Sequence, residues 1–173
     1  MERSKGQQNG ASLVKDAIYG AIGGIVGTLV MEQVANGLYK FEADEKKKIE
    51  EQIRPEPPFM TLARRLAANG ADGPPSEKNV QRLGQAIHWG YGIGWGALYG
   101  ALHDRVPALS RAAGLPFGIV FSLIGDELMT TAMKLTPPPQ AFPIDAHVRG
   151  LVAHVAYTAA ADGVYHTLKR VGG

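Results

Sequence analysis

Residues 83–103 read LGQAIHWGYGIGWGALYGALH and contain no Asp, Glu, Lys or Arg. A helix of about 20 residues crosses the hydrocarbon core of a bilayer, so this stretch is long enough to span a membrane. Gly92, Gly96 and Gly100 recur every fourth position and therefore lie on one face of that helix. In water each glycine weakens a helix by about 1 kcal/mol relative to alanine, whereas in lipid such a row lets two helices approach closely. The stretch predicts a transmembrane helix.

Three more apolar segments flank this one, at about residues 13–39, 112–135 and 146–168. Each of the three contains at least one acidic residue, so only residues 83–103 are a clean spanning candidate. Four segments of this length predict an all-α protein, a four-helix transmembrane bundle that forms a single membrane domain over residues 13–173. Residues 1–12 are polar and are expected to form a mobile tail.

The charged residues are unevenly distributed. Although the mean hydropathy of −0.08 is that of a soluble protein, 17 of the 34 Asp, Glu, Lys and Arg residues fall in residues 40–82. We therefore expect residues 40–82 to form a charged extramembrane insert between the first two helices. The role of its most charged run, residues 42–51, stays open, because Lys46, Lys47 and Lys48 suit either solvent or a partner protein.

The chain contains the signs of an internal repeat. Residues 24–32 read GIVGTLVME and residues 118–126 read GIVFSLIGD, which agree in type at seven of nine positions. The second and fourth segments also align, with His88 on His154. The sequence thus predicts two similar helical hairpins in parallel orientation.

Small residues follow the same four-residue spacing in every segment, which predicts that they lie at helix contacts. The glycines expected there are Gly20, Gly24, Gly92, Gly96, Gly100, Gly114, Gly118 and Gly150.

Ionisable residues continue these rows of small residues. Glu32, His88, Asp126 and His154 all fall in the half of the bundle nearer the charged insert, and Glu127 lies at their edge. Buried charges need partners, so we expect an interior polar cluster in which Glu32 pairs with His88 and Asp126 with His154. His103, His147 and His166 lie near helix ends and are expected to meet water.

The end of the third segment carries a resemblance to a known family. Leu135-Thr136-Pro137-Pro138 follows an apolar helix, and a Gly-x-x-x-His from Gly150 to His154 comes after an acid. With the glycine-rich first helix and Pro57-Pro58 before a short helix, this pattern resembles the YagU-like inner-membrane proteins of bacteria. The resemblance implies an inner-membrane helical protein and no enzyme activity.

Three functions fit these features. A cluster of acids and histidines inside a membrane is typical of a proton or ion pathway or of a pH-responsive element. Alternatively, a haem between His88 and His154, or a transition metal with Glu32 and Asp126 as further ligands, would make the protein a cofactor protein, although this reading is not favoured. The third alternative is a non-catalytic accessory subunit of a larger membrane complex.

The remaining expectations concern partners and location. The chain has no cysteine, so it has no thiol nucleophile and no disulfide, and no hydrolase motif occurs in it; we do not expect an enzyme. The net charge of +2 gives no reason to expect nucleic acid. We expect the lipid bilayer as the main partner, with a homo-oligomer or a membrane complex as the assembly. The location expected is the bacterial inner membrane, and the positive charges of the short loops favour cytoplasmic termini.

Overall fold

The computed structural model describes residues 2–69 and 76–172, and the side chains from residue 12 onward. Within these residues the protein is helical, with no strand. The elements, in chain order, are α1 (Glu2–Phe41), α2 (Asp44–Ile53), α3 (Pro58–Asn69), α4 (Glu77–His103), α5 (Pro107–Val120), the π-helical η1 (Phe121–Leu128), α6 (Met129–Ala132), the short 3₁₀ turn η2 (Pro139–Ala141) and α7 (Ile144–Val171).

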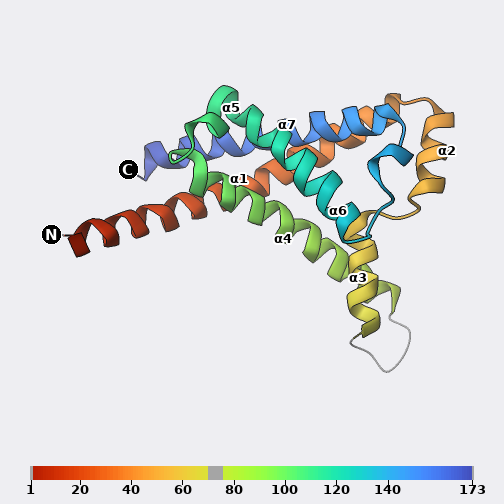
Figure 1. Cartoon of the computed structure of the whole chain (residues 1–173), viewed down its shortest axis with the longest axis horizontal. Helices are drawn as coiled ribbons and strands as arrows, with labels where there is room; N and C mark the ends of the chain where they lie inside the picture. The colour runs from red at the N-terminus through yellow and green to blue at the C-terminus, as the bar shows by residue number, and fades with distance from the viewer. Residues whose placement is uncertain (1, 70–75, 173) are drawn as a thin grey trace.

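The long helices run antiparallel in sequence order, and α5, η1 and α6 together form the third of them (Figure 1). Both termini lie at one end of the molecule, and α2 and α3 lie at the other. The helix starts differ from the sequence expectation. α1 begins at Glu2 instead of Leu13, and α4 begins at Glu77 instead of Leu83.

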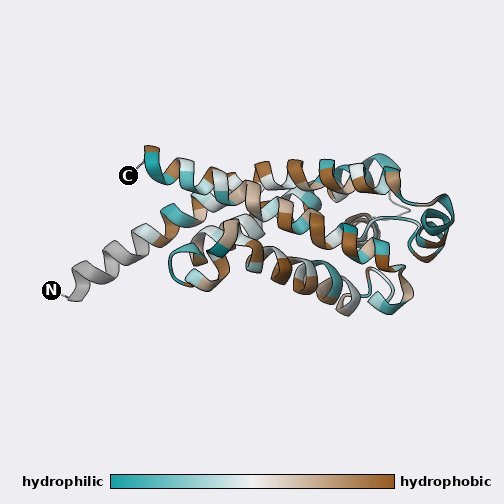
Figure 2. Ribbon diagram, turned by 90° about the horizontal axis from the view of Figure 1, so that it is seen from above, coloured by the Kyte–Doolittle hydropathy of each residue, from teal (hydrophilic) through white to brown (hydrophobic). Residues whose placement is uncertain are grey.

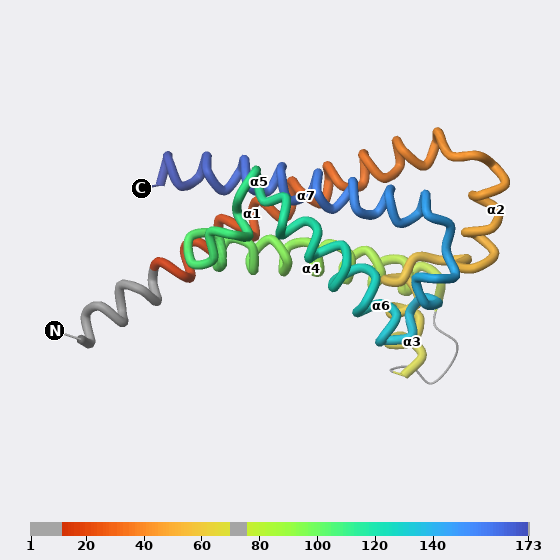
Figure 3. The backbone as a smooth tube through the Cα atoms, turned by 45° about the horizontal axis from the view of Figure 1, so that its top comes forward, coloured from red at the N-terminus to blue at the C-terminus, as the bar shows by residue number. Residues whose placement is uncertain are grey.

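Helix α1 is the centre of the bundle, because it packs against both α4 and α7 (Figure 3). Its contact with α4 is made by glycine backbones. A Cβ atom added at Gly20 would lie 2.7 Å from Gly100 Cα, and one added at Gly96 would lie 2.6 Å from Gly24 Cα. The contact of α1 with α7 uses Gly23, where a Cβ would lie 2.7 Å from the carbonyl oxygen of Ala161. A larger side chain at these positions would separate the helices.

One glycine departs from the sequence expectation, and another meets it in an unexpected backbone conformation. Gly150 does not lie at a close helix contact, because its nearest neighbour would be Asp126 Oδ2 at 3.6 Å, an ordinary separation. Gly114 does lie at a close contact, where a Cβ would be 2.9 Å from Tyr99 Oη on α4, but it lies in a turn with a φ of +75°, in the left-handed region that favours glycine. Gly118 does lie at a close contact, where a Cβ would be 2.9 Å from Val155 Cα on α7.

The third long helix starts later than residue 112. Residues 111–114 have non-helical backbone angles and separate a short turn at Pro107 from the helix that continues to Ala132. Pro116 then falls in the first turn of the continuing helix, where proline costs nothing because its missing N–H has no intrahelical partner.

The C-terminal end of this helix is closed by a Schellman motif. The backbone N–H of Leu135 donates to the carbonyl of Thr130, and that of Lys134 donates to Thr131. Lys134 itself has a φ of +55°. Arg65 of α3 donates to the carbonyls of Met133 and Lys134, so the insert also covers this helix end. The carbonyls left over at the C-terminus are thereby satisfied.

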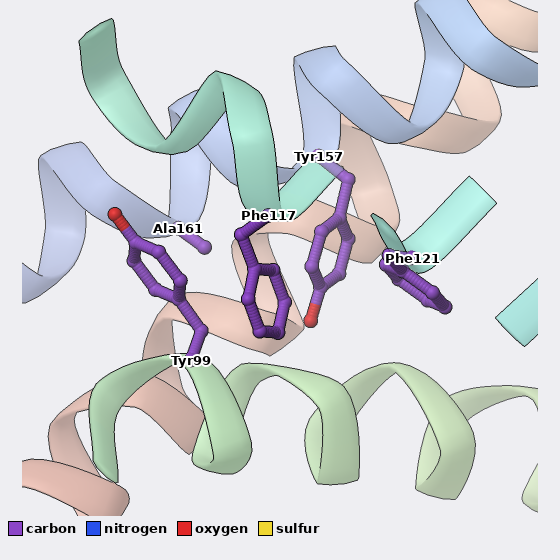
Figure 4. Packing of buried hydrophobic residues seen from close by; sticks show 5 residues of the cluster. All are labelled: Tyr99, Phe117, Phe121, Tyr157 and Ala161. Carbon is purple, nitrogen blue, oxygen red and sulfur yellow. The ribbon is translucent and has the colours of Figure 1, made fainter. Parts of the chain in front are cut away.

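Aromatic side chains fill the space between α4, α5 and α7. Tyr99, Phe117, Phe121 and Tyr157 are fully buried and form one cluster with Ala161 (Figure 4). Their bulk holds α4 away from α5 and α7, whereas glycines bring α1 close to its neighbours. Small residues therefore pack α1 against α4 and α7, whereas aromatic residues fill the space between α4 and the α5–α7 pair.

Two helices are long and apolar enough to cross a membrane among the described residues, namely Ser12–Phe41 and Pro107–Ala132. Only a third of each apolar window is buried inside the protein. Large apolar side chains such as Ile18, Ile22 and Leu123 are exposed, and hydrophilic residues gather at the two ends of the bundle (Figure 2). Residues 83–103, the clean candidate from the sequence, do not pass the same test. They lack charge but are rich in Gly, His and Tyr, and absence of charge is not the same as hydrophobicity.

Candidate functional site

The residues of the expected polar cluster line one cavity of about 690 Å³ at the insert end of the bundle. Its walls come from α1, α4, η1 and α7, and it is closed by α3 and by the link around Pro137 and Pro139. The cavity contains all five expected residues: Glu32, His88, Asp126, Glu127 and His154.

Glu32 and His88 form the pair that the sequence predicts. His88 Nε2 lies 2.9 Å from Glu32 Oε1, which joins α1 to α4. The ring of His88 also packs on Phe59 of α3, with ring centroids 4.7 Å apart. The pair is partly exposed to the cavity, so its proton can exchange with water there.

Asp126 and His154 are not paired with each other, contrary to the sequence expectation. His154 Nδ1 bonds instead to the carbonyl of Gly150, one turn earlier on α7, at 2.7 Å. Helical spacing alone placed the two residues at the same depth but did not reveal this local hydrogen bond.

Glu127 was expected at the edge of the cluster, but it forms a hydrogen-bonded pair of its own with a histidine. Its Oε1 lies 2.7 Å from Nδ1 of His147, and Nε2 of His147 lies 3.0 Å from the carbonyl of Pro139. His147 therefore lines the cavity instead of facing bulk water, which corrects the expectation for this residue. The proline link positions its ring.

Asp126 and Glu127 both line the cavity, and both lie in the π-helical segment η1. Residues 121–128 follow π-helical hydrogen bonding, which is rare and often occurs at functional sites. In a regular α-helix the side chains of two adjacent residues, such as Asp126 and Glu127, point about 100° apart around the helix axis. No sequence pattern that we used predicts a π-helix.

The charged insert supplies the counter-ions for an arginine at the cavity. Arg149 of α7 forms ion pairs with Glu42 and with Glu50, the latter at 2.6 Å, and Arg54 of α2's C-terminal end shares Glu50 at 2.9 Å. Arg149 lies within the fourth apolar segment, where an unpaired charge would be costly. Residues 42–51 therefore have a structural role that the sequence left open.

A stack of rings connects His154 to the aromatic layer under the cavity. The His154 ring meets Phe121 edge-on at 4.5 Å, and Phe121 stacks on Trp95 with centroids 4.5 Å apart and planes 16° apart. The imidazole of His154 is thus in direct contact with an aromatic stack.

A second polar cluster, at the end with the termini, was missed in the sequence. Asp16 is only 2% exposed and receives hydrogen bonds from Lys169 at 2.8 Å and Arg105 at 3.1 Å. Asp104 accepts from Lys169 at 3.0 Å and lies 2.6 Å from Nδ1 of His103. The hydrogen bond with His103 and the Lys169 ammonium lower the pKa of the Asp104 carboxyl below its usual value.

His103 belongs to this cluster and is not exposed to water as expected, because its side chain is only 11% exposed. His166 does meet water, at 48% exposure. Asp162 and His166 occupy the same four-residue row on α7 as His154, and that row was the signal from which this cluster could have been found.

Comparison with known proteins gives a family but no activity. The family described as "protein of unknown function (DUF1440)" matches residues 54–163. The chain belongs to DUF1440. The part that DUF1440 covers contains His88, Asp126, Glu127 and His154, whereas Glu32 precedes it. No curated protein matches the chain, and no solved structure does.

Proposed function

We propose that this DUF1440 protein is an integral membrane protein with four spanning helices: α1, α4, the α5–η1–α6 helix and α7. Two of them meet the criteria of length and apolarity, and their large apolar side chains lie on the outside. An exposed apolar surface of this extent is typical of contact with lipid or another protein. α4 and α7, with 27 and 28 residues, are also longer than the roughly 20 residues that a bilayer requires.

The family resemblance refines this proposal. The Thr136-Pro137-Pro138 link and the Gly150 to His154 spacing support a YagU-like protein of the bacterial inner membrane. In this proposal both termini are cytoplasmic, and α2 and α3 lie on the opposite side of the membrane.

The function we propose is a proton-responsive cavity that serves as the entrance of a proton or ion pathway. The observation that carries it is the presence of two histidine–carboxylate pairs, Glu32–His88 and Glu127–His147, in the wall of one cavity. Histidine changes its charge near neutral pH, and a carboxylate 2.7–2.9 Å away stabilises the charged form. Each pair thus offers a histidine and a carboxylate between which a proton can be shared.

The aromatic layer supplies the gate in this proposal. Phe121 forms part of the cavity wall, and Phe117, Tyr157 and Tyr99 pack behind it. Protonation of His154 would place a cation beside the Phe121 ring, whose centroid is 4.5 Å from that of the imidazole, and would change the electrostatic force on that ring. Displacement of Phe121 would then change its stack with Trp95. No residue in this account acts as a catalyst, and the protein is proposed not to be an enzyme.

A fluorescence titration tests the proton response. Because Trp89 and Trp95 are the only tryptophans, a Trp89→Phe background leaves Trp95 as the sole reporter. We expect its emission to titrate between about pH 5 and 8, and the transition to disappear in His154→Gln. A Trp95 signal that is independent of pH, or unchanged by His154→Gln, would contradict the gate.

A flux assay tests the pathway. Purified protein in liposomes with a trapped pH-sensitive dye is given a pH gradient and a potassium diffusion potential. We expect proton entry that falls at least about tenfold in Glu32→Gln and Glu127→Gln, since each removes a proton-binding partner. The matched control is Glu45→Gln on α2, which makes the same chemical change at an exposed residue outside the cavity. Equal flux in all three variants would reject the cavity as the entrance.

The alternative proposals are a cofactor protein and a subunit of a larger assembly, and purification of the protein separates them. A haem between His88 and His154, or a metal in the cavity, would give a visible spectrum or a metal content that depends on these residues. A homo-oligomer or an accessory subunit would appear as excess mass when the protein is purified in mild detergent.

A further inference from the structure

The second polar cluster contains three metal-ligating side chains that converge at the end of the bundle opposite the cavity. His103 of α4 and Asp162 and His166 of α7 each offer one ligand atom, and these atoms lie within 4.8 Å of one another. His103 Nε2 lies 3.3 Å from Asp162 Oδ1, and His166 Nδ1 lies 3.3 Å from Asp162 Oδ2. Ligands on a tetrahedral metal at 2.0–2.1 Å are about 3.3 Å apart. Each histidine therefore already has this spacing to one Asp162 oxygen, and the three side chains can close on a zinc-sized ion from within 4.8 Å.

His103 carries the strongest evidence, because its two ring nitrogens have different surroundings. Nδ1 lies 2.6 Å from Asp104 Oδ1, as expected when it donates its proton to that carboxylate. Nε2 then presents a lone pair, and it is buried without a hydrogen-bond partner. Its nearest acidic neighbour, Asp162, is also an acceptor. Two acceptors facing each other in a buried place call for a cation between them.

The groups around the ligands match those of metal centres. Histidines that bind metals usually donate their other N–H to a carboxylate, as His103 does toward Asp104, and ligating carboxylates are themselves hydrogen-bonded. Tyr99 donates to Asp162 Oδ1 at 2.5 Å. The nearby ammonium of Lys169 is held by Asp16 and Asp104, so its positive charge is balanced.

We propose that His103, Asp162 and His166 form a binding site for a divalent transition-metal ion of the zinc class. Two histidines and one carboxylate are a typical set for such an ion, with a fourth position left for water. His166 Nδ1 gives up its 3.0 Å hydrogen bond to the Asp162 carbonyl when it binds the ion. Its half-exposed ring provides the entry from solvent. This site is separate from the cavity and does not rest on the function proposed for it.

The test uses the full-length protein in detergent after removal of metal by a chelator. Zn²⁺ is titrated against a chromophoric chelator of known affinity, and Co²⁺ serves as a spectroscopic probe of coordination. We expect one Zn²⁺ per chain and an intense visible Co²⁺ spectrum, typical of a tetrahedral site. His166→Ala, at an exposed position that tolerates change, should weaken Zn²⁺ binding by at least about 100-fold, and Asp104→Asn by about 10-fold.

Two further variants keep the proposal falsifiable. Asp162→Asn retains the volume of the side chain and should abolish the Co²⁺ spectrum, whereas His147→Ala, made in the cavity as the matched control for His166→Ala, should leave the site intact. Binding that depends on His147 or His88 instead of His166 would overturn the proposal. Absence of stoichiometric Zn²⁺ binding would also overturn it. Proton flux through the cavity is measured separately, so either idea can fail alone.

Discussion

Arg149 of α7 donates to both carboxylate oxygens of Glu50 on α2, at 2.7 and 2.6 Å. Both side chains are about 90% buried, with exposed fractions of 11% and 9%. The insert between α1 and α4 is thus anchored to the last helix of the bundle by a buried ion pair. The pair neutralises a cation beside the cavity and fixes the position of the insert.

The first prediction concerns this ion pair. Glu50→Gln should lower the free energy of unfolding by about 2 kcal/mol, because hydrogen bonds to a charged group are lost and Arg149 keeps only Glu42. Thermal unfolding in detergent measures the change. Glu45→Gln, on the exposed face of the same helix, should have no effect. If the two variants unfold alike, the ion pair does not hold the insert.

The second prediction concerns the contact between α1 and α4. In Gly96→Ala the new Cβ would lie 2.6 Å from Gly24 Cα, so the helices must separate, at a cost of about 1–3 kcal/mol. Gly94→Ala is the matched control, since a Cβ there has nothing within 4 Å. That variant should be more stable than the wild type by up to about 1 kcal/mol, because alanine favours helix. The two substitutions should therefore change the free energy of unfolding in opposite directions. Equal changes in both variants would contradict the close contact at Gly96.

The third prediction concerns the end of the third long helix. Lys134 adopts a φ of +55°, which suits glycine better than lysine. Lys134→Gly should raise stability by about 0.5–1 kcal/mol, as measured by thermal unfolding. Arg65, which donates to the backbone carbonyl at this position, keeps its partner in the variant. A loss of stability would mean that the lysine side chain itself contributes here.

The fourth prediction concerns pH. The Lys46 ammonium, 2.5 Å from Asp145 Oδ2, lowers the pKa of the Asp145 carboxyl below its usual value. A pKa that folding lowers stabilises the folded state above the unfolded value of about 3.9, and this contribution is lost as pH falls through the folded pKa. Hydrogen exchange of α2, corrected for intrinsic rates, should therefore accelerate below about pH 4. Lys46→Ala should already show the faster exchange at neutral pH and lose the acid dependence.

The fifth prediction concerns topology. The chain has no cysteine, so single cysteines are unambiguous labels. In intact cells a membrane-impermeant maleimide should label Glu45→Cys, should label Arg170→Cys only after permeabilisation, and should leave Ile22→Cys unlabelled in lipid. Ile22 is exposed on the protein surface, so rapid labelling of Ile22→Cys would show that this surface faces water and would reject the membrane proposal.

Much of the fold could be read from local periodicity. The uncharged residues 83–103, the glycine rows and the proline link predicted four long helices, and the helices are present with shifted ends. Glu32, His88, Asp126, Glu127 and His154 were placed at one depth by spacing alone, and they line one cavity. Helical spacing is sufficient for this, because it determines both the face and the height of each side chain.

The amino-acid sequence by itself determined which residues share a helix face and at which depth they lie. Spacing also predicted the Glu32–His88 pair, but only the tertiary structure decided the other partners, because a hydrogen bond depends on ångström-scale placement across helices. His154 forms a hydrogen bond with the backbone of its own helix, Glu127 pairs with His147, and Glu50 of the insert pairs with Arg149. The meeting of His103 with Asp162 and His166 likewise joins residues about 60 positions apart. Periodicity within one helix gives the face and the height of a side chain, but it does not fix which neighbouring atom packing brings to that side chain.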